Sequence, residues 1–111
     1  MIDTIQSYLD SFDEPAVQRF SLLYNLLLES TTQEIEEKLW ARLPSFYCGK
    51  NFVRIIPFKD HINIEAKAIL TCEDKLHGYK ITPKGLLQIS HQQEIPAEIL
   101  KKVFKESLKT E

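Results

Sequence analysis

The sequence contains little glycine, proline or cysteine, and it has no long apolar run. Its 3 Gly and 5 Pro in 111 residues exclude a collagen-like chain and argue against low complexity. The longest uninterrupted apolar runs have three residues, as at 26–28, so no segment is expected to span a bilayer. Hydrophobic residues make up 43% and charged residues 27%, values typical of a soluble globular chain. We expect one domain over residues 1–111.

Cysteine usage and the first residues both bear on the compartment. Two cysteines, Cys48 and Cys72, are too few for a disulfide framework. The first ten residues carry acids and lack a basic segment followed by an apolar stretch, so no secretory leader is expected. We therefore expect a cytoplasmic protein in which both thiols are reduced.

Motifs of the common catalytic and cofactor-binding classes are also missing. The sequence has no phosphate-binding GxxxxGK(S/T), no GxGxxG, no GxSxG, no HExxH and no CxxC. No nucleophile, base and orienting group can be assembled from the sequence. The sequence therefore predicts a protein that is not an enzyme.

Charge is unevenly distributed along the chain. Residues 1–37 hold eight acids and one base, a sum of −7, whereas residues 38–111 hold thirteen bases and eight acids, a sum of +5. This asymmetry fits a partner or ligand surface, and it fits equally well an ordinary solvated surface. The pI of about 5.9 disfavours nucleic acid as a partner, and we expect no membrane partner either.

Apolar spacing predicts three helices, at residues 4–11, 15–30 and 96–109. Asp3 and Gln6 fit a capping arrangement at the start of the first helix. Each helix has an apolar stripe, which requires a surface to cover. All three stripes are therefore interpreted as core.

Between the second and the last helix the apolar period changes. Residues 52–58 and 62–64 predict two strands joined at Lys59-Asp60, with Pro57 at an edge or near a strand end, and residues 85–90 predict another. Residues 34–43 are ambiguous, because their spacing is helical but Pro44 follows. The expected fold class is α+β: two N-terminal helices, an antiparallel sheet of about four to five strands, and a C-terminal helix packed on it.

Acidic residues in the first third of the chain form the clearest candidate metal site. Carboxylates are hard oxygen ligands suited to ferrous or other divalent ions when several converge. Without His or Cys in the set, binding is expected to be weak and exchangeable. The alternative is that Asp13 and Glu14 stabilise the start of the following helix. The candidate ligands are Asp10, Asp13, Glu14, Glu34, Glu36 and Glu37.

Several short motifs recur along the chain in a recognisable order. Residues 36–64 contain EE, PSF, GK and FKDHI, and residues 78–90 read GYKITPKGLLQIS. Ile95-Pro96 leads into the last helix, and residues 5–12 read IQSYLDSF. These motifs cover nearly the whole chain and resemble the YdhG-like domain-of-unknown-function family.

The resemblance implies a frataxin-like α+β fold and favours a strand for part of residues 34–43. Some members of that family are assigned as intracellular iron chaperones that deliver iron to iron–sulfur cluster or haem assembly proteins. The six acidic residues would then hold the iron. The chain departs from the family pattern at Ala41, Arg42, Glu65 and Pro83. If these positions line a common ligand site, that site is lost or altered here.

Two alternatives to the iron carrier involve no metal. One is a small-molecule or peptide binding module with a cleft between the sheet and the helices. Its candidate lining residues are Trp40, Phe46, Phe52, Tyr79 and Lys84, although core packing explains most of these aromatic residues equally well. The other is a protein-interaction adaptor that relies on charge complementarity alone.

Overall fold

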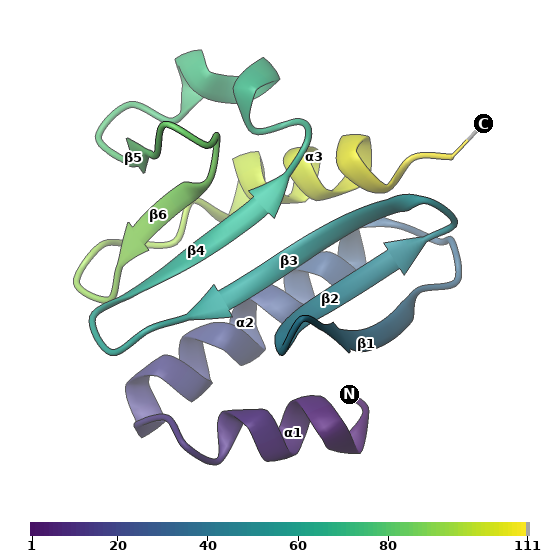
Figure 1. Cartoon of the computed structure of the whole chain (residues 1–111). Helices are drawn as coiled ribbons and strands as arrows, with labels where there is room; N and C mark the ends of the chain where they lie inside the picture. Colours follow the sequence, from purple (N-terminus) through teal and green to yellow (C-terminus); the bar gives the residue numbers. More distant parts are fainter. Residues whose placement is uncertain (111) are drawn as a thin grey trace.

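Helices cover one face of a six-stranded antiparallel sheet in the computed structural model, which describes residues 1–110 (Figure 1). The chain begins with two helices, continues through the strands and a short 3₁₀ helix, and closes with a third α-helix. The elements are α1 (Asp3–Leu9), α2 (Glu14–Ser30), β1 (Glu36–Trp40), β2 (Leu43–Cys48), β3 (Asn51–Pro57), β4 (His61–Ala66), η1 (Leu70–Lys75), β5 (Lys80–Ile81), β6 (Leu87–Ser90) and α3 (Ala97–Leu108). The α+β class is therefore confirmed.

The strands follow the order β1-β2-β3-β4-β6-β5, with β3 and β4 at the centre. Helices α2 and α3 pack against each other and against β3, whereas α1 lies beside β1. In Figure 1 the sheet lies in front of α2 and α3, and η1 lies beyond one end of the sheet. We call the face turned away from the helices the open face.

Alternation along the strands separates the core from the open face. In β4 the second, fourth and sixth residues are buried and the others half-buried. Each large apolar side chain fully removed from water stabilises the fold by about 1.5–3 kcal/mol. The fully buried large side chains are Ile5, Phe20, Leu23, Leu27, Phe46, Ile55, Ile62, Ile64, Ile69, Leu76, Leu87 and Phe104.

The helix predictions are confirmed to within three residues at each end, but the predicted cap of the first helix is wrong. Asp3 is already the first helical residue, and Ile2 occupies the N-cap position without a side-chain cap. The Gln6 amide instead donates to the Met1 carbonyl oxygen at 2.7 Å. No helix within residues 1–110 combines the length and hydrophobicity that a membrane crossing requires.

The sheet has six strands rather than the four to five predicted. The ambiguous segment 34–43 contains β1, which ends at a tight turn where Ala41 and Arg42 have φ of 50° and 67°. Strand β2 was not predicted, because three consecutive residues beginning at Pro44 are buried and the apolar alternation is lost. Strand β5 has only two residues. Pro57 is the last residue of β3, as expected.

Candidate ligand-binding site on the open face

Arg54 lies at the centre of a hydrogen-bonded cluster on the open face. It is on β3, directly opposite Ser45 of β2 and Glu65 of β4, and it is only 6% exposed. Its Nε donates to Ser45 Oγ at 3.0 Å, Nη1 to Glu65 Oε1 at 3.0 Å, and Nη2 to the Tyr47 hydroxyl at 3.1 Å. Each guanidinium nitrogen therefore has a partner, and Glu65 compensates the buried charge.

Two aromatic rings enclose the same guanidinium. The Arg54 Cζ atom lies 4.1 Å from the centroid of Trp40 and 3.9 Å from that of Phe52, distances at which a cation attracts the face of a ring. Trp40 is nevertheless 52% exposed. Lys38 lies over the Tyr47 ring at 4.4 Å. The open face is thus a surface of aromatic and basic side chains fixed by one buried arginine.

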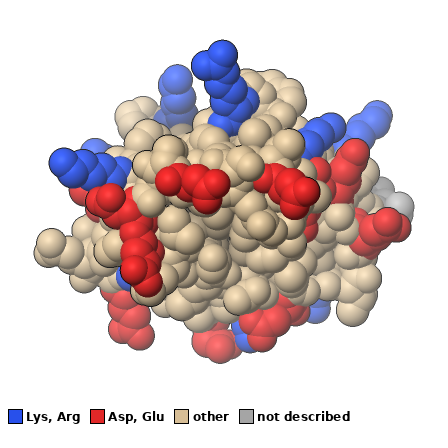
Figure 2. All heavy atoms as spheres, turned by 90° about the horizontal axis from the view of Figure 1, so that it is seen from below, with Lys and Arg blue, Asp and Glu red and all other residues tan. Residues whose placement is uncertain are grey.

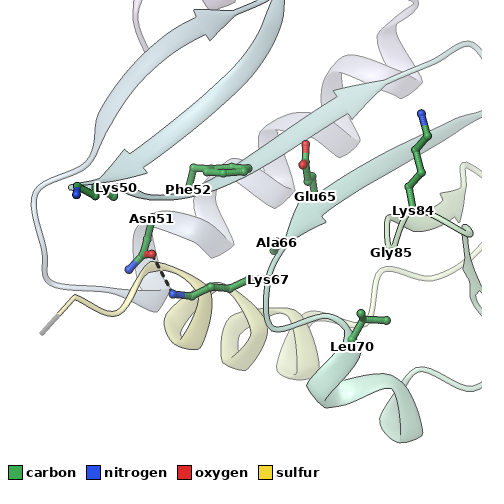
Figure 3. Close-up of a pocket in the computed structure, with 9 residues that line it drawn as sticks. All are labelled: Lys50, Asn51, Phe52, Glu65, Ala66, Lys67, Leu70, Lys84 and Gly85. Atoms are coloured by element: carbon green, nitrogen blue, oxygen red, sulfur yellow. Dashed lines mark hydrogen bonds between the residues drawn. The ribbon is translucent and has the colours of Figure 1, made fainter.

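A hollow of about 250 Å³ adjoins this cluster and shares Phe52 and Glu65 with it. We call it the open-face pocket. Figure 3 shows that its walls come from the β2–β3 turn, the end of β4, the start of η1 and the β5–β6 turn. The Glu65 and Lys84 side chains extend in the same direction in this view. The lining residues are Lys50, Asn51, Phe52, Glu65, Ala66, Lys67, Leu70, Lys84 and Gly85.

A two-residue turn places Lys50 at the rim. Cys48 pairs with Asn51, so Gly49 and Lys50 alone connect β2 to β3. Gly49 has a φ of +61°, which glycine adopts without strain, and glycine at the first central position is typical of hairpin turns. The GK pair in the sequence is therefore a structural turn that also presents an ammonium group.

A second turn carries Lys84. The Gly85 amide donates to the Thr82 carbonyl oxygen at 2.8 Å, with Pro83 in the second position of the turn. The Thr82 amide donates to the Leu86 carbonyl oxygen at 2.8 Å, and the Leu86 amide to Thr82 Oγ1 at 3.1 Å. None of these bonds uses the Lys84 side chain, which is exposed and free to meet a ligand.

Lys67 follows β4 directly and is held from one side. Its Nζ donates to Asn51 Oδ1 at 2.9 Å, and Asn51 Nδ2 donates to the Lys109 carbonyl oxygen at 2.7 Å. An ammonium group has three donors, so the geometry leaves two of them for a ligand or for water. Lys67 is therefore oriented without being neutralised.

The pocket lining is positive, although the whole chain has a net charge of −2. Three lysines and one glutamate line it, a formal sum of +2. The glutamate, Glu65, is already paired with Arg54 at 3.0 Å. In the part of the chain that the structure describes, the ion pairs are Arg54–Glu65, His61–Asp60 and Lys101–Glu29, so none involves a pocket lysine. The three ammonium charges are consequently available to an anion.

The five residues predicted for a binding cleft fall in three environments. Phe52 and Lys84 line the open-face pocket, and Trp40 lies on the same face against Arg54. Phe46 is fully buried, with Tyr24 and Phe20 as aromatic neighbours, and belongs to the core. The Tyr79 hydroxyl donates to the Glu94 carbonyl oxygen away from this pocket.

Sequence analysis did not identify Arg54, Lys50, Lys67 or Leu70 as candidate residues. Of these residues, only Arg54 could have been recognised from the sequence, because it is the one charged residue among apolar residues between Phe52 and Pro57. Of the departures from the family pattern, Glu65 lines the pocket and Pro83 shapes the turn that presents Lys84.

The structure brings only two of the six candidate iron ligands to one hollow. Asp10 and Glu14 both line a cavity of about 590 Å³ between α1 and α2, together with apolar side chains such as Phe12. Asp13 is the N-cap residue of α2 and makes no side-chain cap. Glu14 Oε1 accepts a hydrogen bond from Gln18 at 2.9 Å.

Glu36 and Glu37 point to opposite faces of the sheet, because they are successive residues of β1. Glu37 faces the helices, where Oε1 accepts from the Ile2 amide at 2.9 Å and Oε2 from the Tyr24 hydroxyl at 2.5 Å. Burial and this hydrogen bond raise the pKa of Tyr24 to about 12. Glu36 is exposed, as is Glu34. Glu37 therefore fastens α1 and α2 to β1.

Acidic side chains are spread across the face of the molecule seen in Figure 2 rather than gathered at one point. Within residues 1–110, no three His, Cys, Asp or Glu side chains are grouped so that they could hold a metal ion. Cys48 and Cys72 are both buried and are not joined by a disulfide, and burial raises the pKa of the Cys48 thiol.

Comparison of the chain with protein-family models, curated proteins and solved structures finds no match. The resemblance to the YdhG-like family therefore stays a prediction. The site is argued below from its own geometry and charge.

Proposed function

We propose that this protein is a binding module for a small organic anion, a carboxylate or a phosphate that carries an apolar or aromatic group. The observation that carries the proposal is the open-face pocket, which is lined by three lysines and by the apolar side chains of Phe52 and Leu70, which we call its floor; within residues 1–110 none of these lysines forms an ion pair. The proposal keeps the binding module of the sequence analysis and two of its residues, Phe52 and Lys84, but the pocket lies on the open face and not between the sheet and the helices, as was predicted.

Electrostatics support an anionic ligand. Among residues 1–110 the lining has one carboxylate, Glu65, and it is neutralised by Arg54, whose own charge is enclosed by Trp40 and Phe52. Lysine ammonium groups are compact charges with three hydrogen-bond donors each. Several of them around one hollow attract a carboxylate or phosphate more strongly than one exposed lysine does. A neutral or cationic ligand gains nothing from this arrangement.

The apolar floor supports a ligand with an apolar body. Leu70 is 60% exposed, and it lines the pocket together with Phe52. Covering such surface contributes about 25 cal/mol for each Å² removed from water. A volume of about 250 Å³ is near the lower limit of ligand pockets, which suits a single ring with one charged group.

Phenyl phosphate tests this proposal, because it combines one ring with a dianion. In calorimetric titrations at low ionic strength we expect saturable one-to-one binding that is weakened by salt. Lys84→Met should weaken binding at least about fivefold, whereas Lys59→Met should change it less than about twofold. Lys59 is a suitable control, because it is an exposed lysine on the β3–β4 turn. Equal effects of the two substitutions would reject the site.

Inorganic phosphate separates the charge contribution from the apolar one. If the floor of Phe52 and Leu70 contributes, phenyl phosphate binds more tightly than phosphate, and Leu70→Ser removes the difference. Equal affinities for the two probes would reject the apolar part of the proposal and leave the anion site.

The iron carrier that serves iron–sulfur cluster or haem assembly remains a separate hypothesis. It rests on the family resemblance and on Asp10 and Glu14, which line one hollow. An anaerobic ferrous titration tests it. Saturable binding below about 100 µM that is lost on Asp10→Asn with Glu14→Gln would favour it, and no binding in that range would reject it.

A further inference from the structure

A second basic hollow adjoins the open-face pocket. It has a volume of about 420 Å³ and lies between η1 and α3. Lys67, Lys75 and Lys102 line it, together with Glu106 and the hydroxyl-bearing Thr71. Lys67 lines both hollows, so they meet at this residue.

The second hollow has the same charge balance as the first. Its three lysines and one glutamate give a formal sum of +2. Lys102 and Glu106 are one turn apart on α3, yet no ion pair in the described chain, residues 1–110, includes either of them or Lys75. Five lysines thus border two adjoining hollows, and the like charges repel one another until anions neutralise them.

We infer that the natural ligand is a polyanion that extends past Lys67 and places a second anionic group between η1 and α3. This inference rests on the proposed function, since the first anionic group occupies the open-face pocket. The ligand class is a molecule with two or more separated phosphate or carboxylate groups. A compact polyanion fits better than a long nucleic acid, because the rest of this acidic chain repels an extended phosphate backbone.

Tripolyphosphate tests the extension, with phenyl phosphate as the probe of the open-face pocket alone. The test variant is the double substitution Lys75→Met with Lys102→Met. Its matched control is Lys59→Met with Lys105→Met, which removes the same charge and includes an exposed lysine on the same helix α3. The unmodified protein and both double variants are each titrated with both probes, using the full chain at about 20 mM ionic strength, where charge interactions are weakly screened.

The test variant should weaken tripolyphosphate binding about tenfold and phenyl phosphate binding less than about twofold. The control variant should change both by less than about twofold. If tripolyphosphate responds equally to the two double variants, the extension is wrong. The proposed function survives that result as long as phenyl phosphate still binds normally. If phenyl phosphate fails to bind the unmodified protein, both the proposed function and the extension fail.

Discussion

Substitution of Arg54 by methionine should destabilise the fold and weaken ligand binding together. The change removes the hydrogen bonds to Ser45, Tyr47 and Glu65. A hydrogen bond to a charged group contributes about 1.5–3 kcal/mol, and each desolvated cation–π contact contributes about 0.5–2 kcal/mol. Because these contributions are not additive and the guanidinium no longer has to be desolvated, we expect a net loss of about 2–4 kcal/mol.

Urea unfolding followed by circular dichroism measures this loss, and Lys59→Met serves as the control with an expected change below about 0.5 kcal/mol. Arg54→Lys should recover little, because lysine lacks the planar fork that reaches Ser45, Tyr47 and Glu65 at once. Phenyl phosphate should bind Arg54→Met more weakly, since the Glu65 carboxylate is then no longer neutralised. A loss below about 1 kcal/mol would refute the view that Arg54 organises the open face.

Three further predictions test the charge, backbone and packing parts of the account. Glu65→Gln should tighten phenyl phosphate binding about threefold to tenfold in calorimetry, because Arg54 then loses its compensating carboxylate and the formal charge beside the pocket rises by one; unchanged or weaker binding would contradict this. Gly85→Ala and Gly78→Ala should each cost about 1–2 kcal/mol in urea unfolding, since both glycines have positive φ, but only Gly85→Ala should also weaken binding. Tyr24 has a folded pKa of about 12, above its unfolded value near 10, so its contribution to the free energy of unfolding should hold up to pH 10 and fall towards pH 12 by on the order of 2 kcal/mol. Tyr24→Phe should remove this fall between pH 10 and pH 12. If the free energy of unfolding declines equally with pH in both proteins, the prediction is refuted.

The sequence was sufficient to predict elements with a clear period. The stripe of α2, the alternation in β4 and the proline before α3 each identify an element directly. Strand β2 lacked such a pattern, because its residues are buried on both faces of the sheet. The short β5 depends on pairing with β6 rather than on its own residues.

The candidate site was harder to predict, because it depends on contacts between distant segments. Lys50, Lys67 and Lys84 come from three separate connections, and nothing in their local sequence indicates that they meet at one hollow. The acidic residues illustrate the opposite case. Glu36 and Glu37 are neighbours in sequence, yet strand geometry sends them to opposite faces, and only the assignment of residues 34–43 as a strand reveals this.

Chemical-shift mapping with phenyl phosphate tests the open-face pocket most directly. In ¹H–¹⁵N spectra of the labelled full chain, the account predicts saturable shifts at the amides of Lys50, Phe52, Lys67 and Gly85, which come from three connections and from strand β3 but line one pocket. Absent shifts, or shifts centred on the hollow of Asp10 and Glu14 between α1 and α2, would contradict it.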